Sequence, residues 1–244
     1  MRIEIVALSN FPEVNPGDDL AAFIRNSVQE QSQPIDHSVI LAVAQKIVSK
    51  AEGALVDLRE IQPSALAKSW ALEWSKDPRL IELIFSQSRR IVKMDRGVLI
   101  AESRLGHVCA NAGVDQSNVK DDNFATILPK DPDASAARLQ KELGCGAVIV
   151  TDTFGRPWRE GLVDVAIGVA GLKALEDYRG RGDRYGRKLT GTVIALADQL
   201  AAAAGILMRK SAGYPVVLFR GLDWQAGDGS GHSLLRSRDQ DLFR

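Results

Sequence analysis

The sequence predicts an α+β fold in which mixed sheets pack against helices. Three observations predict it: the 244-residue chain mixes strand-like and helix-like periods, no repeat length recurs, and no low-complexity linker interrupts it. A chain of this length can bury roughly 70% of its unfolded surface, which is enough for one large domain or two small lobes. We therefore expect one domain over residues 1–244, with a division into two lobes left open.

Two strands and a helix are predicted first. Residues 2–8 alternate in polarity and are rich in β-branched side chains, which is typical of a strand. The turn sequence at 15–18 precedes a helix that we expect to reach about Val28. Residues 38–44 form a compact apolar run and predict a buried strand.

Two helices follow. Pro63-Ser64 opens an amphipathic helix that contains Trp70 and Trp74. Asp77-Pro78 opens a second helix, which we expect to end near Ser88. The two tryptophans are four residues apart on one helix, a spacing that favours a place in the core or an interface.

The middle of the chain predicts a hairpin, a loop and a strand. Residues 90–94 and 98–102 are the arms of the hairpin, and residues 124–128 are the strand. The segment between them, 104–118, is rich in Gly, Asn and Asp, and we expect a loop that could carry chemistry.

In the next segment a helix is predicted between two strands. Asp131-Pro132-Asp133 signals a helix over 134–143. Residues 147–150 predict a buried strand, and Thr151-Asp152-Thr153 would place an acid and a hydroxyl at its C-terminal end. Residues 162–170 predict another strand.

The last elements are the longest helix, over residues 190–208, and a strand over 214–220. An arginine cluster at 178–188 precedes the helix. Because Asp177 and Asp183 lie among these cations, we expect a self-neutralising surface loop there in preference to an anion site.

Composition excludes several classes of protein. Hydrophobic residues are 45% of the chain, and 31 Lys and Arg balance 31 Asp and Glu, so neither disorder nor polybasic nucleic-acid binding is expected. No apolar run is long enough to cross a membrane and no leader sequence is visible, so we expect a cytoplasmic protein with no membrane partner. Cys109 and Cys145 are too few for a disulfide scaffold.

Common nucleotide and zinc motifs are missing. No P-loop sequence occurs, and Gly180, Gly182 and Gly186 do not have dinucleotide-fold spacing. The three histidines lie far apart, which disfavours a zinc hydrolase. His107 and Cys109 would lie on one face of an extended segment, but neither has a predicted partner in the sequence, which disfavours a cysteine nucleophile.

Two segments carry side chains that could bind cations with a preference for oxygen ligands. Asp115 and Asn118 lie in the polar segment 109–118, and Mg²⁺ and Mn²⁺ prefer such oxygen ligands. The alternative there is a turn in which Asn and Asp bond only their own backbone.

The second segment, 151–159, combines Asp152 and two threonines with two arginines suited to phosphate binding. The alternative for this segment is a strand cap with surface arginines. Lys50 could be a point charge for phosphate or a solvated lysine.

Seven stretches, taken in order, carry a family resemblance. They are residues 15–20 (NPGDDL), 45–53 (QKIVSKAEG), 111–118 (NAGVDQSN), 128–136 (LPKDPDASA), 151–159 (TDTFGRPWR), 166–172 (AIGVAGL) and 177–180 (DYRG). Together they resemble the coenzyme F-420-0:L-glutamate ligase family, which adds glutamate to a deazaflavin cofactor precursor. The resemblance runs along nearly the whole chain.

The resemblance implies a gamma-glutamyl-ligase-like fold and an intertwined homodimer. It implies GTP, L-glutamate and F-420-0 as substrates, with two divalent Mg²⁺ or Mn²⁺ ions and K⁺ as helper. The first divalent ion would bind Asp115 and Asp152, the second Thr153, and Lys50 would act with the two aspartates in catalysis. The implied nucleotide contacts are Phe11, Pro12, Glu13, Val14, Gln45, Lys46, Lys50, Asn118, Arg209, Lys210, Ser211, Ala212 and Gly213.

The implied reaction activates a carboxylate as an acyl phosphate with GTP, after which the amine of glutamate displaces phosphate. The chain departs from the family pattern at Gly205, where relatives carry an acid, at Arg209, where they carry glycine, and at Leu162, where a polar residue is common. Two alternatives remain: an amide ligase with another acceptor, and a non-catalytic nucleotide-binding homologue. We expect no C-terminal nitroreductase-like domain.

Overall fold

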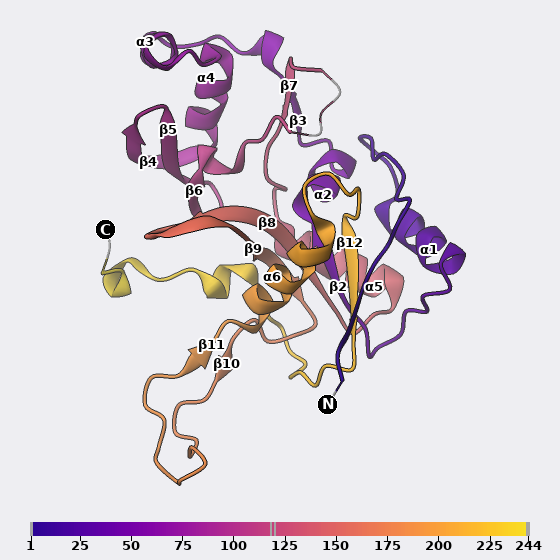
Figure 1. The fold of residues 1–244 in the computed structure, drawn as a ribbon. Helices are drawn as coiled ribbons and strands as arrows, with labels where there is room; N and C mark the ends of the chain where they lie inside the picture. Colours follow the sequence, from indigo (N-terminus) through magenta and orange to yellow (C-terminus); the bar gives the residue numbers. More distant parts are fainter. Residues whose placement is uncertain (1, 118, 120, 243–244) are drawn as a thin grey trace.

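A five-stranded mixed sheet is the centre of the molecule (Figure 1). The computed structural model describes residues 2–117, 119 and 121–242. The strands follow the order β1 (Glu4–Ala7), β12 (Val216–Arg220), β2 (Ile40–Ala44), β8 (Ala147–Arg156) and β9 (Arg159–Ala170). Strands β2 and β8 run parallel, whereas the other neighbouring pairs are antiparallel.

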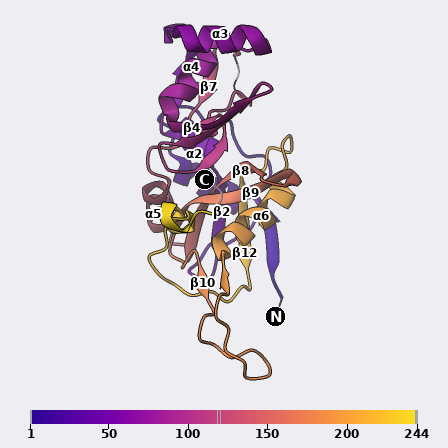
Figure 2. The same ribbon diagram turned by 90° about the vertical axis from the view of Figure 1, so that its left-hand side faces the viewer.

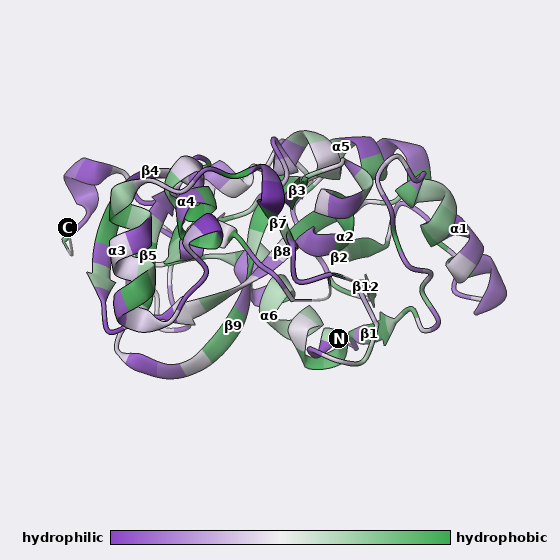
Figure 3. Ribbon diagram, turned by 90° about the horizontal axis from the view of Figure 1, so that it is seen from above, coloured by the Kyte–Doolittle hydropathy of each residue, from purple (hydrophilic) through white to green (hydrophobic). Residues whose placement is uncertain are grey.

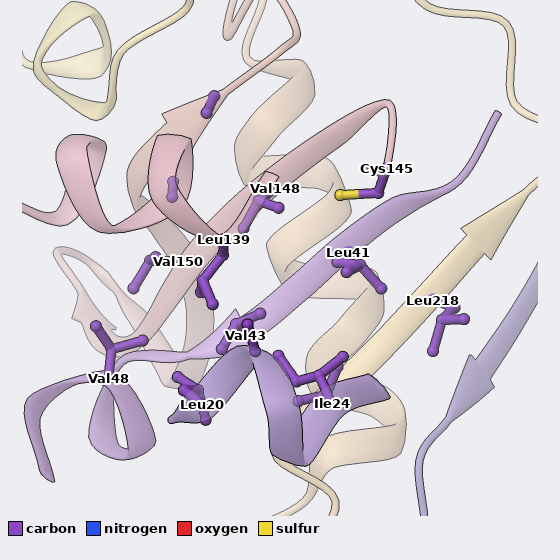
Figure 4. Packing of buried hydrophobic residues seen from close by; sticks show 14 of the residues in the cluster. Leu20, Ile24, Leu41, Val43, Val48, Leu139, Cys145, Val148, Val150 and Leu218 are labelled. Carbon is purple, nitrogen blue, oxygen red and sulfur yellow. The ribbon is translucent and has the colours of Figure 1, made fainter. Parts of the chain in front are cut away.

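Helices cover both faces of this sheet because the residues of its central strands alternate between two cores. Leu41 and Val43 of β2 face one cluster, beneath α1 (Leu20–Glu30), α2 (Gln45–Ala51) and α5 (Pro132–Leu143) (Figure 4). Ile40 and Ala42 face the opposite cluster, beneath α6 (Leu196–Met208). The apolar run that predicted a buried strand therefore reflects burial on both faces.

A third cluster of buried residues lies at the end of the molecule opposite α1 (Figure 3). It is covered by α3 (Ala65–Trp74) and α4 (Pro78–Gln87), and Trp70 is part of it. The sheets beside it are formed by β4 (Ser88–Asp95), β5 (Val98–Ser103) and β6 (Val108–Ala110), and by β3 (Leu55–Asp57) with β7 (Phe124–Thr126). The division of the chain into domains stays a prediction.

An arm projects from the main sheet, on the side away from α3 and α4 (Figures 1 and 2). Short strands β10 (Glu176–Asp177) and β11 (Val193–Ile194) pair at its base. The arginine cluster lies in the exposed loop between them, and Asp177 binds Arg179 there as the charge pattern predicted. Short 3₁₀ helices at Leu58–Glu60, Asn111–Gly113, Gly231–Leu234 and Arg238–Gln240 complete the described structure.

The structure confirms a mixed α+β architecture and most of the predicted elements. Three predictions were wrong in extent. The expected loop at 104–118 contains β6 and the 3₁₀ turn Asn111–Gly113. The long helix begins at Leu196, because the β-branched residues before it pair in β11. Strand β8 continues beyond Val150 to Arg156, because its polar second half pairs with β9. None of the described helices combines the length and hydropathy that crossing a bilayer requires.

Candidate active site

A cavity of about 620 Å³ opens where β2 ends and α2 begins. Five segments distant in the sequence meet around it: the loop before α1, the start of α2, Asp115, the β8–β9 hairpin, and the end of α6 with the following loop. Most of the residues predicted for the site line this cavity: Phe11, Pro12, Glu13, Val14, Gln45, Lys46, Lys50, Asp115, Asp152, Thr153, Arg209, Lys210, Ser211 and Gly213. Ala212 is not among the lining residues, and Asn118 lies outside the described residues.

The parallel pairing of β2 with β8 explains how two of these segments meet. Ala44, the last residue of β2, lies beside Thr151 of β8. The chain turns into α2 directly after Ala44, whereas β8 continues past Thr151. Lys46 and Asp152 therefore line the same cavity, at the carboxyl edge of the parallel pair, where α/β proteins commonly place ligands.

Asp115 is held by the backbone of β7 and by a lysine. Its backbone N–H donates to Thr126 O at 3.0 Å, and Thr126 N–H donates to Asp115 O at 2.8 Å. Its carboxylate binds Lys46 Nζ at 2.8 Å and accepts a hydrogen bond from Ser117 N–H at 2.7 Å. Burial alone would raise the pKa of Asp115, but the hydrogen bonds from Lys46 and Ser117 outweigh it, so the pKa is lowered. Asp115 is therefore an anchored anion.

Asp152 is a contrasting carboxyl group in the same cavity. Burial raises its pKa to about 6, and repulsion from Asp115 adds to the shift. A hydrogen bond from Thr153 N–H at 2.8 Å and attraction to Lys210 and Lys46 oppose it. The two aspartates line the same cavity, although 36 residues separate them in the sequence. Buried like charges of this kind are favourable sites for a cation.

Thr153 connects two elements that carry charged groups. Its hydroxyl donates to Asp164 Oδ1 of β9 at 2.5 Å and accepts from Lys210 Nζ at 2.7 Å. Asp164 also lines the cavity and was not predicted from the sequence. The turn at 157–158 by itself would pair Thr153 with Leu162. A register shift between Gly155 and Arg156 places Asp164 opposite Thr153 instead, and no local sequence signal predicts that shift.

The expected phosphate-binding lysine is already paired within the protein. Lys50 Nζ lies 2.6 Å from Glu13 Oε1, and only 11% of the Lys50 side chain is exposed. The reading of Lys50 as a solvated lysine is therefore wrong. Gln45 is also buried and accepts a hydrogen bond from Ser49 Oγ at 2.8 Å, which fixes the first turn of α2.

Gly205 and Arg209, two of the three positions at which we expected a departure from the family pattern, lie in the last two turns of α6 and directly after it. Arg209 has φ of +46° and ψ of 175°, a backbone conformation that favours glycine. A Cβ atom at Gly205 would lie 2.6 Å from Asp164 Oδ2. Arg209 thus adopts a backbone conformation that favours glycine although the residue is arginine.

Several other predicted groups have structural roles. Burial raises the pKa of the Cys109 thiol to about 12, so it is not an activated nucleophile. Asn111, Ala112 and Gly113 form a left-handed turn, and a Cβ at Gly113 would meet Leu128 at 2.6 Å. These small residues therefore serve packing and do not line the cavity. Arg156 bonds carbonyl groups of its own hairpin, which agrees with the reading as a surface arginine.

Comparisons with known proteins identify the family. Residues 9–221 match the family model described as F420-0:Gamma-glutamyl ligase. The chain is 44% identical to the coenzyme F420:L-glutamate ligase of Methanothermobacter thermautotrophicus, with all of both chains covered. It is also 44% identical to the enzyme of that name from Methanopyrus kandleri, covering all of this chain and 98% of the relative. For the Methanocaldococcus jannaschii relative the identity is 41%, over 86% of each chain. The protein therefore belongs to the F420-0:gamma-glutamyl ligase family, and it is a ligase that forms carbon–nitrogen bonds.

Proposed function

We propose that this ligase joins L-glutamate to the deazaflavin precursor F420-0 and that it uses GTP, releasing GDP and phosphate. The relatives' names support glutamate and the deazaflavin as substrates. The observation that carries the nucleotide-dependent reaction is one cavity lined by Asp115, Asp152, Thr153 and three lysines. A triphosphate is a polyanion, and bringing a carboxylate next to it requires cations.

The donor atoms in the cavity fit hard divalent cations, Mg²⁺ or Mn²⁺. Two carboxylates and a hydroxyl supply oxygen, the ligand atom that these ions prefer. Within the described part of the chain, no three His, Cys, Asp or Glu side chains group closely enough to hold a metal by themselves. Nucleotide phosphates would then supply further ligands, as Mg²⁺ commonly requires. When bound, the ions would neutralise phosphate charge; K⁺ as helper stays a prediction.

The reaction that we propose has two steps. The carboxylate of F420-0 attacks the γ-phosphorus of GTP, which forms an acyl phosphate and releases GDP. The amine of glutamate, after losing a proton, attacks the acyl carbon and displaces phosphate. Lys46 and Lys210 are placed to bind phosphate oxygens once they leave Asp115 and Thr153, and Lys50 could do so on leaving Glu13. Arg209 adds a further cation at the cavity wall.

The experiment that tests this function is an incubation of the purified protein with GTP, Mn²⁺, L-glutamate and F420-0, followed by product mass and GDP release. We expect one glutamate residue of added mass and one GDP per bond. Asp115→Ala and Asp152→Ala should each lower turnover by roughly 10²-fold or more while the fold survives. Asp95→Ala is the control, because Asp95 is in β4, outside the cavity.

Three results would contradict the proposal in different ways. Near-normal turnover of both cavity variants would remove the aspartates from the reaction. GDP release with another acceptor but not with F420-0 would favour the first alternative, a ligase of different acceptor. Tight GTP binding without GDP release would favour a non-catalytic homologue.

We also propose that the active form is an intertwined homodimer in the cytoplasm. The projecting β10–β11 arm supports the dimer, because its exposed loop carries Tyr185 and several arginines away from the main sheet (Figure 2). Light scattering of the intact chain should give twice the monomer mass. Shortening the loop between β10 and β11 should reduce that mass, and a monomeric intact chain would contradict the dimer.

A further inference from the structure

Asp164 is a carboxylate of the cavity to which neither the motifs nor the family match assigns a role. It lies on β9 directly opposite Thr153 of β8, within the antiparallel ladder of the hairpin. Its Oδ1 is 2.5 Å from Thr153 Oγ1, and it lines the same cavity as Asp152. Both strands are continuous here, so the backbone fixes where Asp164 and Thr153 stand relative to one another.

The hydrogen bonds of Thr153 determine which way its hydroxyl points. A threonine hydroxyl has one hydrogen to donate and two lone pairs to accept with, an ionised carboxylate can only accept, and a lysine ammonium can only donate. The bond between Thr153 and Asp164 therefore uses the single hydroxyl hydrogen. The bond from Lys210 Nζ, 2.7 Å away, meets a lone pair of the same oxygen. Asp164 thus leaves the lone pairs of Thr153 facing a cation, which in this structure is the Lys210 ammonium.

Gly205 provides the room that Asp164 occupies. The second carboxylate oxygen of Asp164 lies 2.6 Å from the place where a Cβ atom at position 205 would be. A glycine within a helix is less favourable than alanine, so its place in α6 calls for a reason in packing or function. Close approach of the Asp164 carboxylate is that reason.

We propose that Asp164 is a positioning residue of the ligase site, which holds the Thr153 hydroxyl with its lone pairs toward a bound cation, and that Gly205 is required to admit it. The inference rests on the proposed function, in which Thr153 is a cation ligand. Carboxylates that accept a hydrogen bond from a ligand group fix its orientation and commonly change metal affinity 10–100-fold when removed. Asp164 would therefore act through Thr153 and not by touching substrate.

The test measures binding of Mn²⁺ directly, by the electron paramagnetic resonance signal of the free ion, in the presence of GDP. Asp164→Ala should weaken the Mn²⁺ site that depends on Thr153 by about 10-fold or more, and Asp164→Asn should weaken it less, because its amide oxygen can still accept the hydrogen bond. Thr153→Val should weaken the same site. Combining Asp164→Ala with Thr153→Val should add little, because residues that act through one group are not additive.

Asp198→Ala is a matched control. Asp198 is also a carboxylate between α6 and β9; it accepts a hydrogen bond from Ala166 N–H at 2.9 Å but does not line the cavity. Its removal should lower the melting temperature and leave the Mn²⁺ affinity unchanged. A loss of affinity that merely follows lost stability would appear in this control as well.

Gly205→Ala tests the same inference with Asp164 intact. The added methyl group should displace the Asp164 carboxylate and weaken Mn²⁺ binding as Asp164→Ala does, although alanine favours the helix. Wild-type Mn²⁺ affinity in both Asp164→Ala and Gly205→Ala would overturn the inference. The proposed function would still be tested separately, by the turnover of Asp115→Ala. If the wild-type protein with GDP binds no Mn²⁺ at all, the metal part of the proposed function falls and this inference falls with it.

Discussion

At the scale of single residues, the pKa values of two carboxyl groups in one cavity shift in opposite directions. Asp115 has a lysine partner and two hydrogen bonds from Ser117 to its carboxylate, so its pKa is lowered. Asp152 has one backbone donor and deeper burial, and its pKa rises to about 6. Above pH 6 the protein therefore retains an ionised group in an unfavourable place, and such groups are a common compromise between stability and activity.

Asp152→Asn should stabilise the cation-free protein at pH 7. A pKa raised from 3.8 to about 6 means that the ionised group opposes folding above pH 6, by at most about 3 kcal/mol at 1.36 kcal/mol per pKa unit. Because Asp152 is not fully enclosed, we expect a gain of about 1–2 kcal/mol in urea unfolding. Asp95→Asn, on an exposed strand, should change stability by less than about 0.5 kcal/mol. A less stable Asp152→Asn protein would contradict the assignment.

His107 should make stability depend on pH in the opposite direction. Burial lowers its pKa from 6.5 to about 4, and its ring packs edge-to-face against Phe154. The unfolded chain therefore binds the proton more readily than the folded protein between pH 6.5 and 4. Through His107, the free energy of unfolding decreases as the pH falls through that window, by at most about 3 kcal/mol. The contribution of Asp152 to the free energy of unfolding increases as the pH falls over much of the same window, so the two effects partly cancel in the wild-type protein.

The measurement that isolates this effect is urea unfolding of His107→Gln at pH 7, 6, 5 and 4. Its free energy of unfolding should fall less on acidification than that of the wild-type protein, because no proton-binding group is lost on folding. Equal slopes for the two proteins would show that His107 is not buried as a neutral ring.

At the scale of elements, the end of α6 carries backbone strain beside the cavity. Arg209 adopts φ of +46° with ψ of 175°, which an L-residue reaches only at a cost of about 1–3 kcal/mol. The strain is retained where a charged side chain lines the site. Residues held in such conformations concentrate at functional sites because the surrounding structure and the function both constrain them.

Arg209→Gly should therefore raise the free energy of unfolding by about 1–2 kcal/mol, because glycine adopts this conformation without a Cβ penalty. Arg209→Ala is the control, since it removes the charged side chain but keeps the Cβ atom. The melting temperature should rise in the glycine variant only. A similar rise in both variants would assign the cost to the side chain and not to the backbone.

At the scale of the whole molecule, one half-buried aspartate joins segments from three regions of the chain. Asp133, in the first turn of α5, accepts hydrogen bonds from Val169 N–H of β9 at 2.8 Å and from Gly231 N–H at 2.7 Å. Its other oxygen binds the hydroxyl of Ser230. The segment after β12 is thus attached to the edge strand of the main sheet through α5.

Asp133→Ala should lower the free energy of unfolding by about 2–4 kcal/mol, because two backbone N–H groups and a hydroxyl lose a charged acceptor. Limited proteolysis should then cut the segment after β12 before other parts of the chain. Asp133→Asn should lower the free energy of unfolding less, since the amide oxygen of asparagine can still accept hydrogen bonds. Proteolysis that begins instead in the β10–β11 loop, with no change in stability, would contradict the anchoring role.

The sequence predicted local structure well where local interactions decide it. Caps such as Asp77 and Asp131 marked helix starts, because their side chains bind free N–H groups of the first turn. It failed where a distant partner decides: residues 151–156 look like a polar turn until β9 pairs with them. Most candidate site residues were predicted through the family resemblance and line one cavity, whereas Asp164 was missed.

The sequence by itself determined the order of most strands and helices, the burial of β2 and the family to which the chain belongs. Periodicity, capping and motif order are properties of neighbouring residues, so they can be read along the chain. Only the tertiary structure decided that Asp115 and Asp152 line one cavity, that Glu13 binds Lys50, and that Gly205 leaves space for Asp164. Those contacts join residues far apart in sequence, and they depend on strand register and helix packing, which no local pattern specifies.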